Sequence, residues 1–371
     1  MGPTRTVINH KNLVHNLKLL QAAVGKTEIM GVVKAEAYGH GVNEVARTLV
    51  NHGVQNLGVA FAEEGLGLRK AGIRAPILVF GAHLPEYLEE QIIYDLDITL
   101  TGLHQIEAIG RFCRQRQKEA RIHIKFDTGM NRVGFSLDEF ETLFNILLKE
   151  EWIKIAGVYS HFSSSDEEDE EYTRLQIQKF LQLKTALKNI LKNGPKFHIA
   201  NSAAIMHYPE SYLDIVRPGV MLYGYVPNPD FKHNWPLREV MRLISRVTLI
   251  KKVNPNQPVS YNRRYYTKKD TKLALVPVGY GDGFNRRLMN RGEVLIRGKR
   301  YPIAGSICMD QFLVDIGNDS QIEIGDEVVL IGSQGKEQIS VMDVAKMLDT
   351  IPYEVTCWVG VRVPRFHEVV T

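Results

Sequence analysis

One lysine, Lys34, ends a short apolar run at residues 29–34, and a glycine-containing stretch follows it directly. The run contains β-branched residues and is bounded by turn-forming residues, so it predicts a short buried strand. A lysine at such a strand end is partly desolvated, which lowers its pKa and lets the amine act as nucleophile, Schiff base or proton carrier. A lone lysine at a strand end more often extends its amine into water. The functional interpretation therefore depends on the surrounding elements.

Strand and helix patterns alternate over the first two-thirds of the chain. Short apolar runs predict eight strands, at residues 29–34, 57–60, 77–80, 98–101, 122–127, 154–159, 197–200 and 213–217. The stretches between them have the three- and four-residue apolar spacing of helices, at residues 43–52, 63–71, 103–117, 137–149 and 172–191. Such alternation implies right-handed crossovers and a parallel sheet, and eight units predict a closed (β/α)8 TIM-like barrel. A doubly wound open sheet is the alternative, but no Gly-x-Gly-x-x-Gly motif follows an early strand.

The pattern becomes rich in strands near residue 235. The predicted strands are residues 243–253, 272–277, 294–297, 311–316 and 327–331, with one helix at 341–348. A chain of 371 residues is also too long for one ordinary core. We therefore expect an α/β barrel domain over residues 1–235 and a smaller, mainly-β domain over residues 236–371.

The composition is that of an ordinary globular protein, with 44% hydrophobic residues, 24% charged residues and a net charge of +4. The basic pairs are scattered, so we expect no nucleic-acid partner. No stretch approaches the roughly 20 apolar residues of a membrane span, and no secretory signal is visible. Three widely separated cysteines, Cys113, Cys308 and Cys357, indicate reduced thiols. These features together predict a cytoplasmic protein without a membrane partner.

Polar side chains follow five of the predicted barrel strands, at the end where barrel active sites lie. They are Lys34, Arg132, His161, Asn201, Ser202 and Arg217. Ser202 at a helix start suits an anion, and Gly219 lets the backbone come close to one. The loops after the last two barrel strands often form a phosphate site. A phosphate beside a Schiff-base lysine indicates pyridoxal 5'-phosphate, the cofactor that serves as an electron sink.

Longer motifs make the chain resemble the alanine racemase family over essentially its whole length. They lie at residues 33–41, 127–130, 216–219, 260–261, 279–283, 307–311 and 351–354. The resemblance implies an isomerase that uses pyridoxal phosphate, through an external aldimine and two bases, to interconvert L-alanine and D-alanine, a cell-wall precursor. It also implies a homodimer with shared active sites. A racemase of broader range, acting on serine or basic amino acids, is the alternative. Non-enzymatic carriers of the cofactor lack the second domain, so Tyr261 and Met309 argue against that class.

The resemblance further implies a role for each matching residue. Lys34 would form the internal aldimine and act as one base, and Tyr261 of the other subunit would be the second. Arg217 would face the pyridine nitrogen, and His161 would link Arg217 to Tyr261. The expected cofactor-binding residues are Lys34, Tyr38, Arg132, His161, Asn201, Ser202, Arg217, Gly219, Val220 and Tyr353. The expected substrate-binding residues are Arg132, Met309 and Tyr280, of which Tyr280 would narrow the entrance.

Lys125 is a further candidate, because its strand alternates apolar and polar residues. If the apolar set packs on the helices, Lys125 points into the barrel, where an ammonium beside Arg132 would be costly. In relatives the matching lysine can be carbamylated, which would give an anion able to orient Arg132. The alternative is a lysine that is neutral or paired with Asp127.

Overall fold

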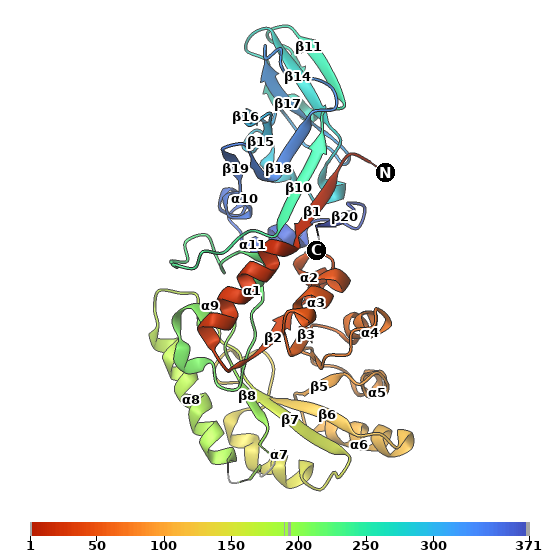
Figure 1. The fold of residues 1–371 in the computed structure, drawn as a ribbon, viewed down its shortest axis with the longest axis vertical. Helices are drawn as coiled ribbons and strands as arrows, with labels where there is room; N and C mark the ends of the chain where they lie inside the picture. The colour runs from red at the N-terminus through yellow and green to blue at the C-terminus, as the bar shows by residue number, and fades with distance from the viewer. Residues whose placement is uncertain (1, 189, 192–193, 369–371) are drawn as a thin grey trace.

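The computed structural model describes residues 2–188, 190–191 and 194–368. It shows a barrel region and, beyond it, a region rich in strands (Figure 1). One hydrophobic core cluster contains side chains of both regions.

Eight parallel strands form the barrel, in the spatial order β8-β7-β6-β5-β4-β3-β2-β9. Their bounds are β2 Glu28–Val32, β3 Asn56–Val59, β4 Ile77–Val79, β5 Asp97–Leu100, β6 Ala120–Lys125, β7 Ile153–Tyr159, β8 Lys196–His198 and β9 Ile215–Val216. Between β8 and β9, the N–H of Asp214 donates to the carbonyl of Phe197 at 3.0 Å, and the N–H of Arg217 donates to the carbonyl of Ala200 at 2.9 Å. These bonds bring the ring close to closure and confirm the predicted barrel.

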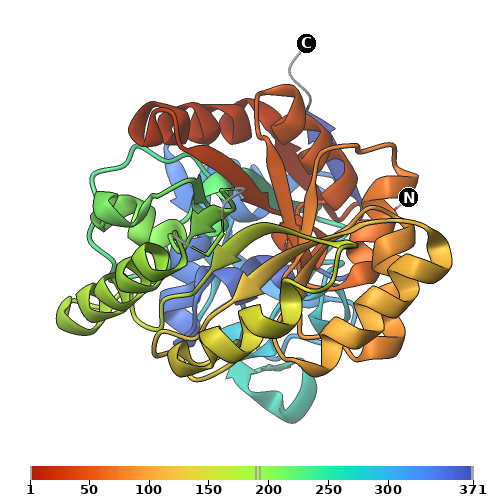
Figure 2. The same cartoon turned by 90° about the horizontal axis from the view of Figure 1, so that it is seen from below.

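Helices cover the outside of these strands, as the view from below shows (Figure 2). The helices of the barrel region are α1 His10–Val24, α2 Lys34–Tyr38, α3 Val42–Asn51, α4 Ala62–Lys70, α5 Leu88–Ile93, α6 His104–Arg116, α7 Phe140–Leu147, α8 Glu171–Leu187 and α9 Ser202–His207. Short 3₁₀ turns are η1 Pro85–Tyr87, η2 Leu137–Glu139, η3 Pro209–Ser211 and η4 Val220–Tyr223. The α-helices turn their apolar sides toward the strands. Helix α6, for example, buries Ile106, Ile109 and Cys113. None of the helices in the described ranges has both the length and the apolar character needed to cross a bilayer.

The second region contains three sheets. The largest has the order β16-β15-β18-β10-β1-β20, with β19 paired to β18, and the smaller sheets are β11-β14-β17 and β12-β13. The strands are β1 Arg5–Asn9, β10 Met241–Arg246, β11 Leu249–Val253, β12 Pro258–Val259, β13 Tyr265–Tyr266, β14 Thr271–Val276, β15 Glu293–Ile296, β16 Lys299–Pro302, β17 Phe312–Gly317, β18 Glu327–Gln334, β19 Glu337–Ile339 and β20 Arg365–Glu368. The remaining elements are α10 Val341–Leu348, α11 Pro352–Cys357, η5 Tyr261–Arg263, η6 Tyr280–Asp282 and η7 Arg286–Leu288.

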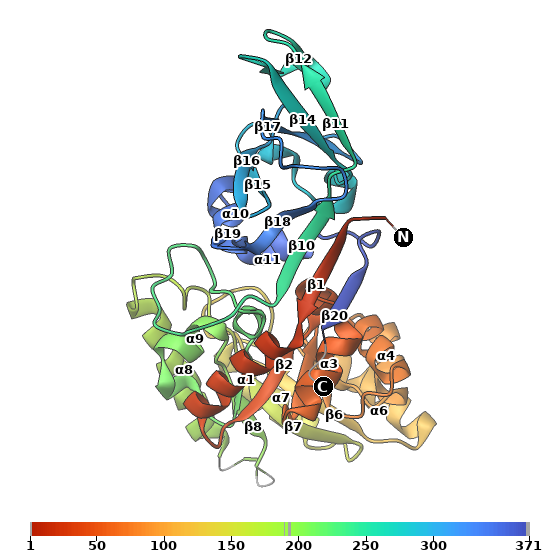
Figure 3. The same ribbon diagram turned by 45° about the horizontal axis from the view of Figure 1, so that its top comes forward.

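Two features of this region differ from the sequence-based expectation. The single strand predicted at residues 243–253 is wrong, because the segment forms two strands, β10 and β11, in different sheets. The N-terminal strand β1, which the apolar pattern did not predict, lies between β10 and β20 (Figure 3). It pairs antiparallel with β10 and parallel with β20. Residues from both ends of the chain thus join the largest sheet.

Candidate active site

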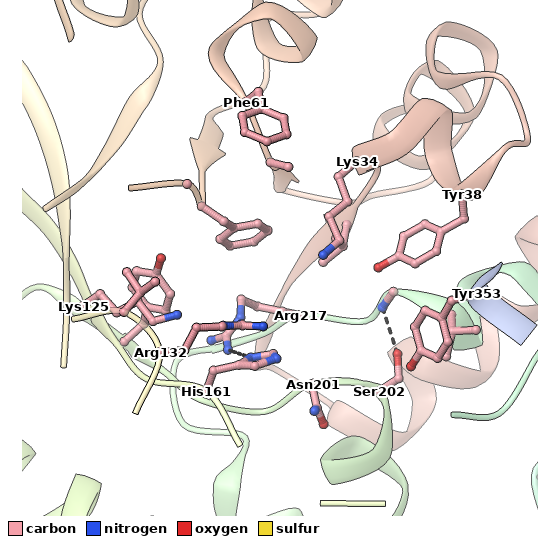
Figure 4. Close-up of a pocket in the computed structure, with 18 of the residues that line it drawn as sticks. Lys34, Tyr38, Phe61, Lys125, Arg132, His161, Asn201, Ser202, Arg217 and Tyr353 are labelled. Atoms are coloured by element: carbon pink, nitrogen blue, oxygen red, sulfur yellow. Dashed lines mark hydrogen bonds between the residues drawn. The ribbon is translucent and has the colours of Figure 1, made fainter. Parts of the chain in front are cut away.

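A cavity of about 370 Å³ lies at the C-terminal ends of the barrel strands. It collects the predicted residues Lys34, Tyr38, Lys125, Arg132, His161, Asn201, Ser202, Arg217, Gly219, Val220 and Tyr353 (Figure 4). All but one of these follow or end barrel elements, whereas Tyr353 comes from α11. The second region therefore contributes a wall of the cavity.

Lys34 is held by an unusual backbone segment directly after β2. The four residues from Ala35 to Tyr38 all have left-handed φ angles of 52–55°. This conformation is strained for residues with a Cβ, costing roughly 1–2 kcal/mol each. The carboxylate of Glu64 accepts the N–H groups of Ala35 and Ala60, each at 2.6 Å, and that of Phe61 at 3.1 Å. Glu64 thus ties the strained turn to the next loop and fixes the direction in which Lys34 enters the cavity.

The Lys34 amine is partly desolvated, as the sequence led us to expect. Burial lowers its pKa below the usual range, and the positive charge of Arg132 lowers it further. Glu64 opposes this shift in part, because its carboxylate favours the ammonium form. The amine is therefore closer to a neutral base than an exposed lysine would be.

An anion cradle forms where α9 begins. The N–H of Gly219 donates to the Ser202 hydroxyl at 2.9 Å. A Cβ at Gly219 would lie 2.5 Å from the hydroxyl oxygen of Tyr38, so the close approach of Tyr38 requires glycine there. The Tyr38 and Tyr353 rings pack with centroids 5.9 Å apart. Asn201 caps the helix, because its side-chain oxygen accepts the N–H of Ala204 at 2.9 Å.

Arg217 is buried beside the cavity and donates several hydrogen bonds. Its guanidinium donates to the carbonyl of Ser160 at 2.7 Å, to that of Ile199 at 3.0 Å and to His161 Nδ1 at 3.1 Å. Burial lowers its pKa to about 10, so the group remains a cation at neutral pH. Burial, then Arg217, lowers the pKa of His161 well below its usual value. The neutral His161 ring accepts at Nδ1 and so carries its proton on Nε2.

Lys125 points into the barrel, which confirms the direction predicted from its strand. Its amine lies 5.0 Å from the centroid of the Tyr159 ring, and it is 7% exposed. Burial, then the charges of Arg217 and Arg132, lowers its pKa to about 7. The amine can therefore lose its proton near neutral pH, unlike an exposed lysine.

The charge of the cavity fits pyridoxal phosphate. Two lysines and two arginines line it, and none of its lining residues is a carboxylate. Phosphate and a ring phenolate are anionic, so they complement this excess of positive charge. The Gly219–Ser202 cradle and the amine of Lys34 match the two ends of the cofactor. Within the described ranges, no group of His, Cys, Asp and Glu side chains is arranged to hold a metal ion.

The three remaining predicted residues lie elsewhere. Tyr261, Met309 and Tyr280 are 70%, 53% and 45% exposed, and they do not line this cavity. The N–H of Gly281 donates to the carbonyl of Met309 at 2.9 Å. The hydroxyl of Ser306 donates to the carbonyl of Tyr261 at 2.8 Å. The segment around residues 306–309 thus ties the three residues into one surface, which we call the exposed edge.

Sequence reasoning missed several residues of the site. Phe61, Phe80 and Tyr159 line the cavity, and Glu64 orders the loop below Lys34. The signal for Glu64 was its place three residues after Phe61, where a carboxylate can cap a helix start. Tyr159 is the last residue of a predicted strand, as Lys34 is. The same position at a strand end could therefore have identified it.

Two family models and several curated relatives match this chain. The model described as "Alanine racemase, N-terminal domain" matches residues 8–227, and "Alanine racemase, C-terminal domain" matches residues 240–367. The chain is 42% identical to alanine racemase 2 of Caldanaerobacter subterraneus subsp. tengcongensis, over 98% of this chain and 95% of the relative. It is also 42% identical to the alanine racemase of Halothermothrix orenii, over 99% of this chain and 97% of the relative.

Solved structures of racemases have the same fold as this chain. The alanine racemase from D-cycloserine producing Streptomyces lavendulae has a TM-score of 0.94 at 34% identity, covering 100% of this chain and 98% of that chain. The histidine racemase from Leuconostoc mesenteroides subsp. sake has a TM-score of 0.91 at 25% identity, covering 99% of this chain and 98% of that one.

Proposed function

The chain belongs to the alanine racemase family, and on that premise we propose that it interconverts L-alanine and D-alanine with pyridoxal phosphate in the barrel cavity. The observation that carries the proposal is the meeting of Lys34, the Gly219–Ser202 cradle and Arg217 in one electropositive cavity. When bound, pyridoxal phosphate withdraws electrons from the amino acid and makes its Cα–H bond more acidic. The protein must then supply bases and hold the reacting groups.

The proposed binding roles follow from the position of each side chain. Tyr38, Ser202 and Tyr353 would hold the phosphate through their hydroxyl groups, and Gly219, whose N–H donates to Ser202, would let the backbone come close to it. Val220 and Asn201 would complete that wall, and Arg132 would hold the phenolic oxygen. Arg217 would face the ring nitrogen, where its fixed positive charge keeps that nitrogen unprotonated. An unprotonated ring stabilises negative charge less, which favours prompt return of the proton over side reactions.

Racemisation needs a proton removed from one face of Cα and returned to the other. Lys34 would serve one face, since its lowered pKa makes the amine a better proton acceptor near neutrality. Tyr261 would serve the other face, with His161 Nε2–H as a donor that steadies the phenolate. Met309 and Tyr280 would contact the substrate from the same side. Because these three residues lie on the exposed edge, we propose that a second copy of the chain brings them to the cavity.

Complementation between two inactive variants tests this shared site. We expect Lys34→Ala and Tyr261→Phe to be inactive alone, whereas co-expressed mixtures recover about a quarter of the activity, since half of the dimers carry one intact site. The mixed species is isolated with two different tags, and each variant paired with itself is the control. A mixed dimer without activity would show that both bases come from one chain.

The reaction itself is tested by chiral chromatography of L-alanine incubated with the protein and pyridoxal phosphate. The enantiomers have equal free energy, so an active racemase brings them to a ratio of about 1:1. A broader racemase is the second candidate, favoured by the similarity to a histidine racemase. The same assay with serine, lysine, arginine and histidine separates the two. Alanine left unchanged beside a racemised basic amino acid would replace our proposal by the second.

Two further expectations stay proposals. We propose that Lys125 is carbamylated, since its neutral amine can add CO2 and lose one proton to give a carbamate beside Arg132. Its lowered pKa supplies the neutral amine near pH 7. We also propose a cytoplasmic location, supported by Cys113, Cys308 and Cys357, each of which is a free thiol.

A further inference from the structure

Behind the cavity, a line of buried polar side chains crosses the barrel interior. Arg217 Nη1 lies 2.8 Å from His198 Nδ1, and His198 Nε2 lies 2.9 Å from His123 Nδ1. His123 Nε2 lies 3.3 Å from a carboxylate oxygen of Asp97. Arg217, His198, His123 and Asp97 are each at most 4% exposed. This line of hydrogen bonds, from Arg217 to Asp97, joins the cavity wall to the N-terminal end of strand β5.

The chemistry of its two ends sets the direction of every hydrogen bond. Arginine only donates, so His198 Nδ1 must accept and its proton must lie on Nε2. Burial, then the Arg217 charge, lowers the pKa of His198 well below its usual value, which keeps the ring neutral. The His198 Nε2–H then donates to His123 Nδ1, and the His123 Nε2–H donates to Asp97. Each ring has one allowed tautomer.

Asp97 is the acceptor on which this order depends. Burial raises the pKa of Asp97, but hydrogen bonds from His123 and Arg121 outweigh burial and hold it below its usual value. Arg121 donates two bonds to the carboxylate, from Nε at 2.8 Å and from Nη2 at 3.2 Å. A carboxylate has enough lone pairs to serve Arg121 and His123 together, whereas an amide has one oxygen.

The barrel leaves space for the histidine contact at one glycine. Strand β7 lies between β6, which carries His123, and β8, which carries His198. Gly157 on β7 is in register with His123. A Cβ on Gly157 would overlap His123 Nδ1. On the cavity side, the Tyr159 ring stacks on His198 with centroids 4.9 Å apart and planes 2° apart. Both rings are therefore confined in orientation.

We propose that Asp97, acting through His123 and His198, is a positioning residue for Arg217. The chain of fixed tautomers presents a lone pair to the guanidinium and so holds it where the cofactor ring binds. This inference rests on the proposed function only for the contact between Arg217 and the cofactor. Asp97, His123 and His198 touch no substrate, and their effect is carried by orientation.

The first test is Asp97→Asn in the cofactor-loaded protein labelled with ¹⁵N-histidine. Arg121 needs an acceptor, so the Asn oxygen turns toward it and the amide NH2 faces His123 Nε2. We expect both His123 and His198 to change from the Nε2–H to the Nδ1–H tautomer, which NMR reads from the ring nitrogen shifts. Asp214→Asn is the matched control. The Asp214 carboxylate accepts the N–H of Phe197 at 2.7 Å and is not part of the line of hydrogen bonds from Arg217 to Asp97.

The same variants test the effect on Arg217. In Asp97→Asn the Nδ1–H of His198 would face the guanidinium, and two donors cannot share one bond. We expect weaker cofactor binding and a several-fold higher ratio of transamination to racemisation, with neither change in Asp214→Asn. Adding Arg121→Leu frees the Asn oxygen to accept from His123, so the double variant should regain the original tautomers and ratio. A merely structural role of Asp97 predicts no such rescue.

Gly157→Ala independently disturbs the middle of the line of hydrogen bonds, at His123. Its Cβ should displace His123 and raise the same ratio while Asp97 is intact. The proposal is overturned if Asp97→Asn leaves the His198 tautomer unchanged, or if Asp214→Asn changes the ratio equally. If the wild-type protein fails to racemise any amino acid, the proposed function fails, whereas the NMR result still decides the tautomer chain.

Discussion

The barrel cavity and the exposed edge place the two proposed bases in different surroundings, because Lys34 lines the cavity and Tyr261 does not. Lys34 lines the cavity, and although its side chain is exposed in the single chain, its partial desolvation lowers its pKa. Tyr261 is 70% exposed and does not line the cavity. A base works best where water is excluded and its partners are fixed. The barrel cavity gathers its lining residues within one chain, whereas Tyr261 lies on a surface outside it.

Backbone conformation sharpens the contrast. Both bases lie beside residues with positive φ: four follow Lys34, and Ser260, Asn262 and Arg263 surround Tyr261 at 63°, 60° and 51°. Near Lys34, Glu64 ties the strained turn by accepting three N–H groups. Near Tyr261, the Ser260 hydroxyl donates to the carbonyl of Ser306 at 2.7 Å. Strain of this kind persists where the surroundings enforce it and is concentrated at functional sites.

Lys34→Ala should have the largest effect, because it removes the proposed base of the barrel cavity. We expect racemisation to fall by at least about 10³-fold, the range for losing a positioned general base. Chiral chromatography measures the rate, and Lys18→Ala on α1 serves as the control. Residual activity within tenfold of wild type would place the base elsewhere.

Tyr261→Phe should separate the two halves. We expect racemisation to fall by about 10²- to 10⁴-fold, while one enantiomer of alanine still exchanges its Cα hydrogen with D2O through Lys34. Mass spectrometry of each enantiomer measures the exchange. Tyr266→Phe is the matched control, because Tyr266 is also exposed, at 52%, on the neighbouring strand β13. Equal loss of exchange in both enantiomers would contradict the division of faces.

The barrel was predictable because its strands are buried on both faces and read as continuous apolar runs, as at β4 Ile77–Val79. The position of the candidate cavity was predictable because such a barrel gathers the residues after its strands at one end, whereas Tyr261, Tyr280 and Met309 do not line the cavity. β1 was not predictable in the same way, since its partners in β10 and β20 are hundreds of residues away. At residues 243–253 the apolar pattern gave no sign of the change of sheet after Arg246.

The line of hydrogen bonds from Arg217 to Asp97 could not be predicted from the sequence for a related reason. His123 stood in the alternating pattern that placed Lys125 in the barrel, but its partner His198 lies 75 positions along the chain. Only the register of β6, β7 and β8 brings them together, across Gly157. A histidine in a strand does not by itself indicate which nitrogen carries its proton.

Gly219→Ala should affect the barrel half without touching either base. The new Cβ would lie 2.5 Å from the Tyr38 hydroxyl, so this donor must leave the cradle. Losing a hydrogen bond to a charged group corresponds to about 10- to 100-fold weaker cofactor binding. Absorbance titration with pyridoxal phosphate measures the dissociation constant. Gly67→Ala is the control, because a Cβ there meets nothing within 4 Å; equal weakening in both variants would refute the cradle.

The prediction for Lys125 has the smallest expected effect, and it tests how far burial in the barrel changes the pKa and carbamylation of its amine. The pKa of about 7 means that the amine loses its proton as pH rises through 7, whereas exposed lysines stay charged until about pH 10. At a fixed CO2 pressure, the carbamate should therefore increase between about pH 6 and 8, because CO2 reacts with the neutral amine.

Carbon-13 NMR with labelled CO2 reads the carbamate directly, and Lys125→Gln should remove the signal. Lys251→Gln, on strand β11 of the second region, should leave it intact. A signal that persists in Lys125→Gln would place the carbamate on another amine, and one that appears only above about pH 9 would mean that Lys125 keeps an ordinary pKa. Arg132 would then be oriented without a carbamate, and Asp127, whose carboxylate accepts the Arg132 N–H at 3.0 Å, would be left to position the loop alone.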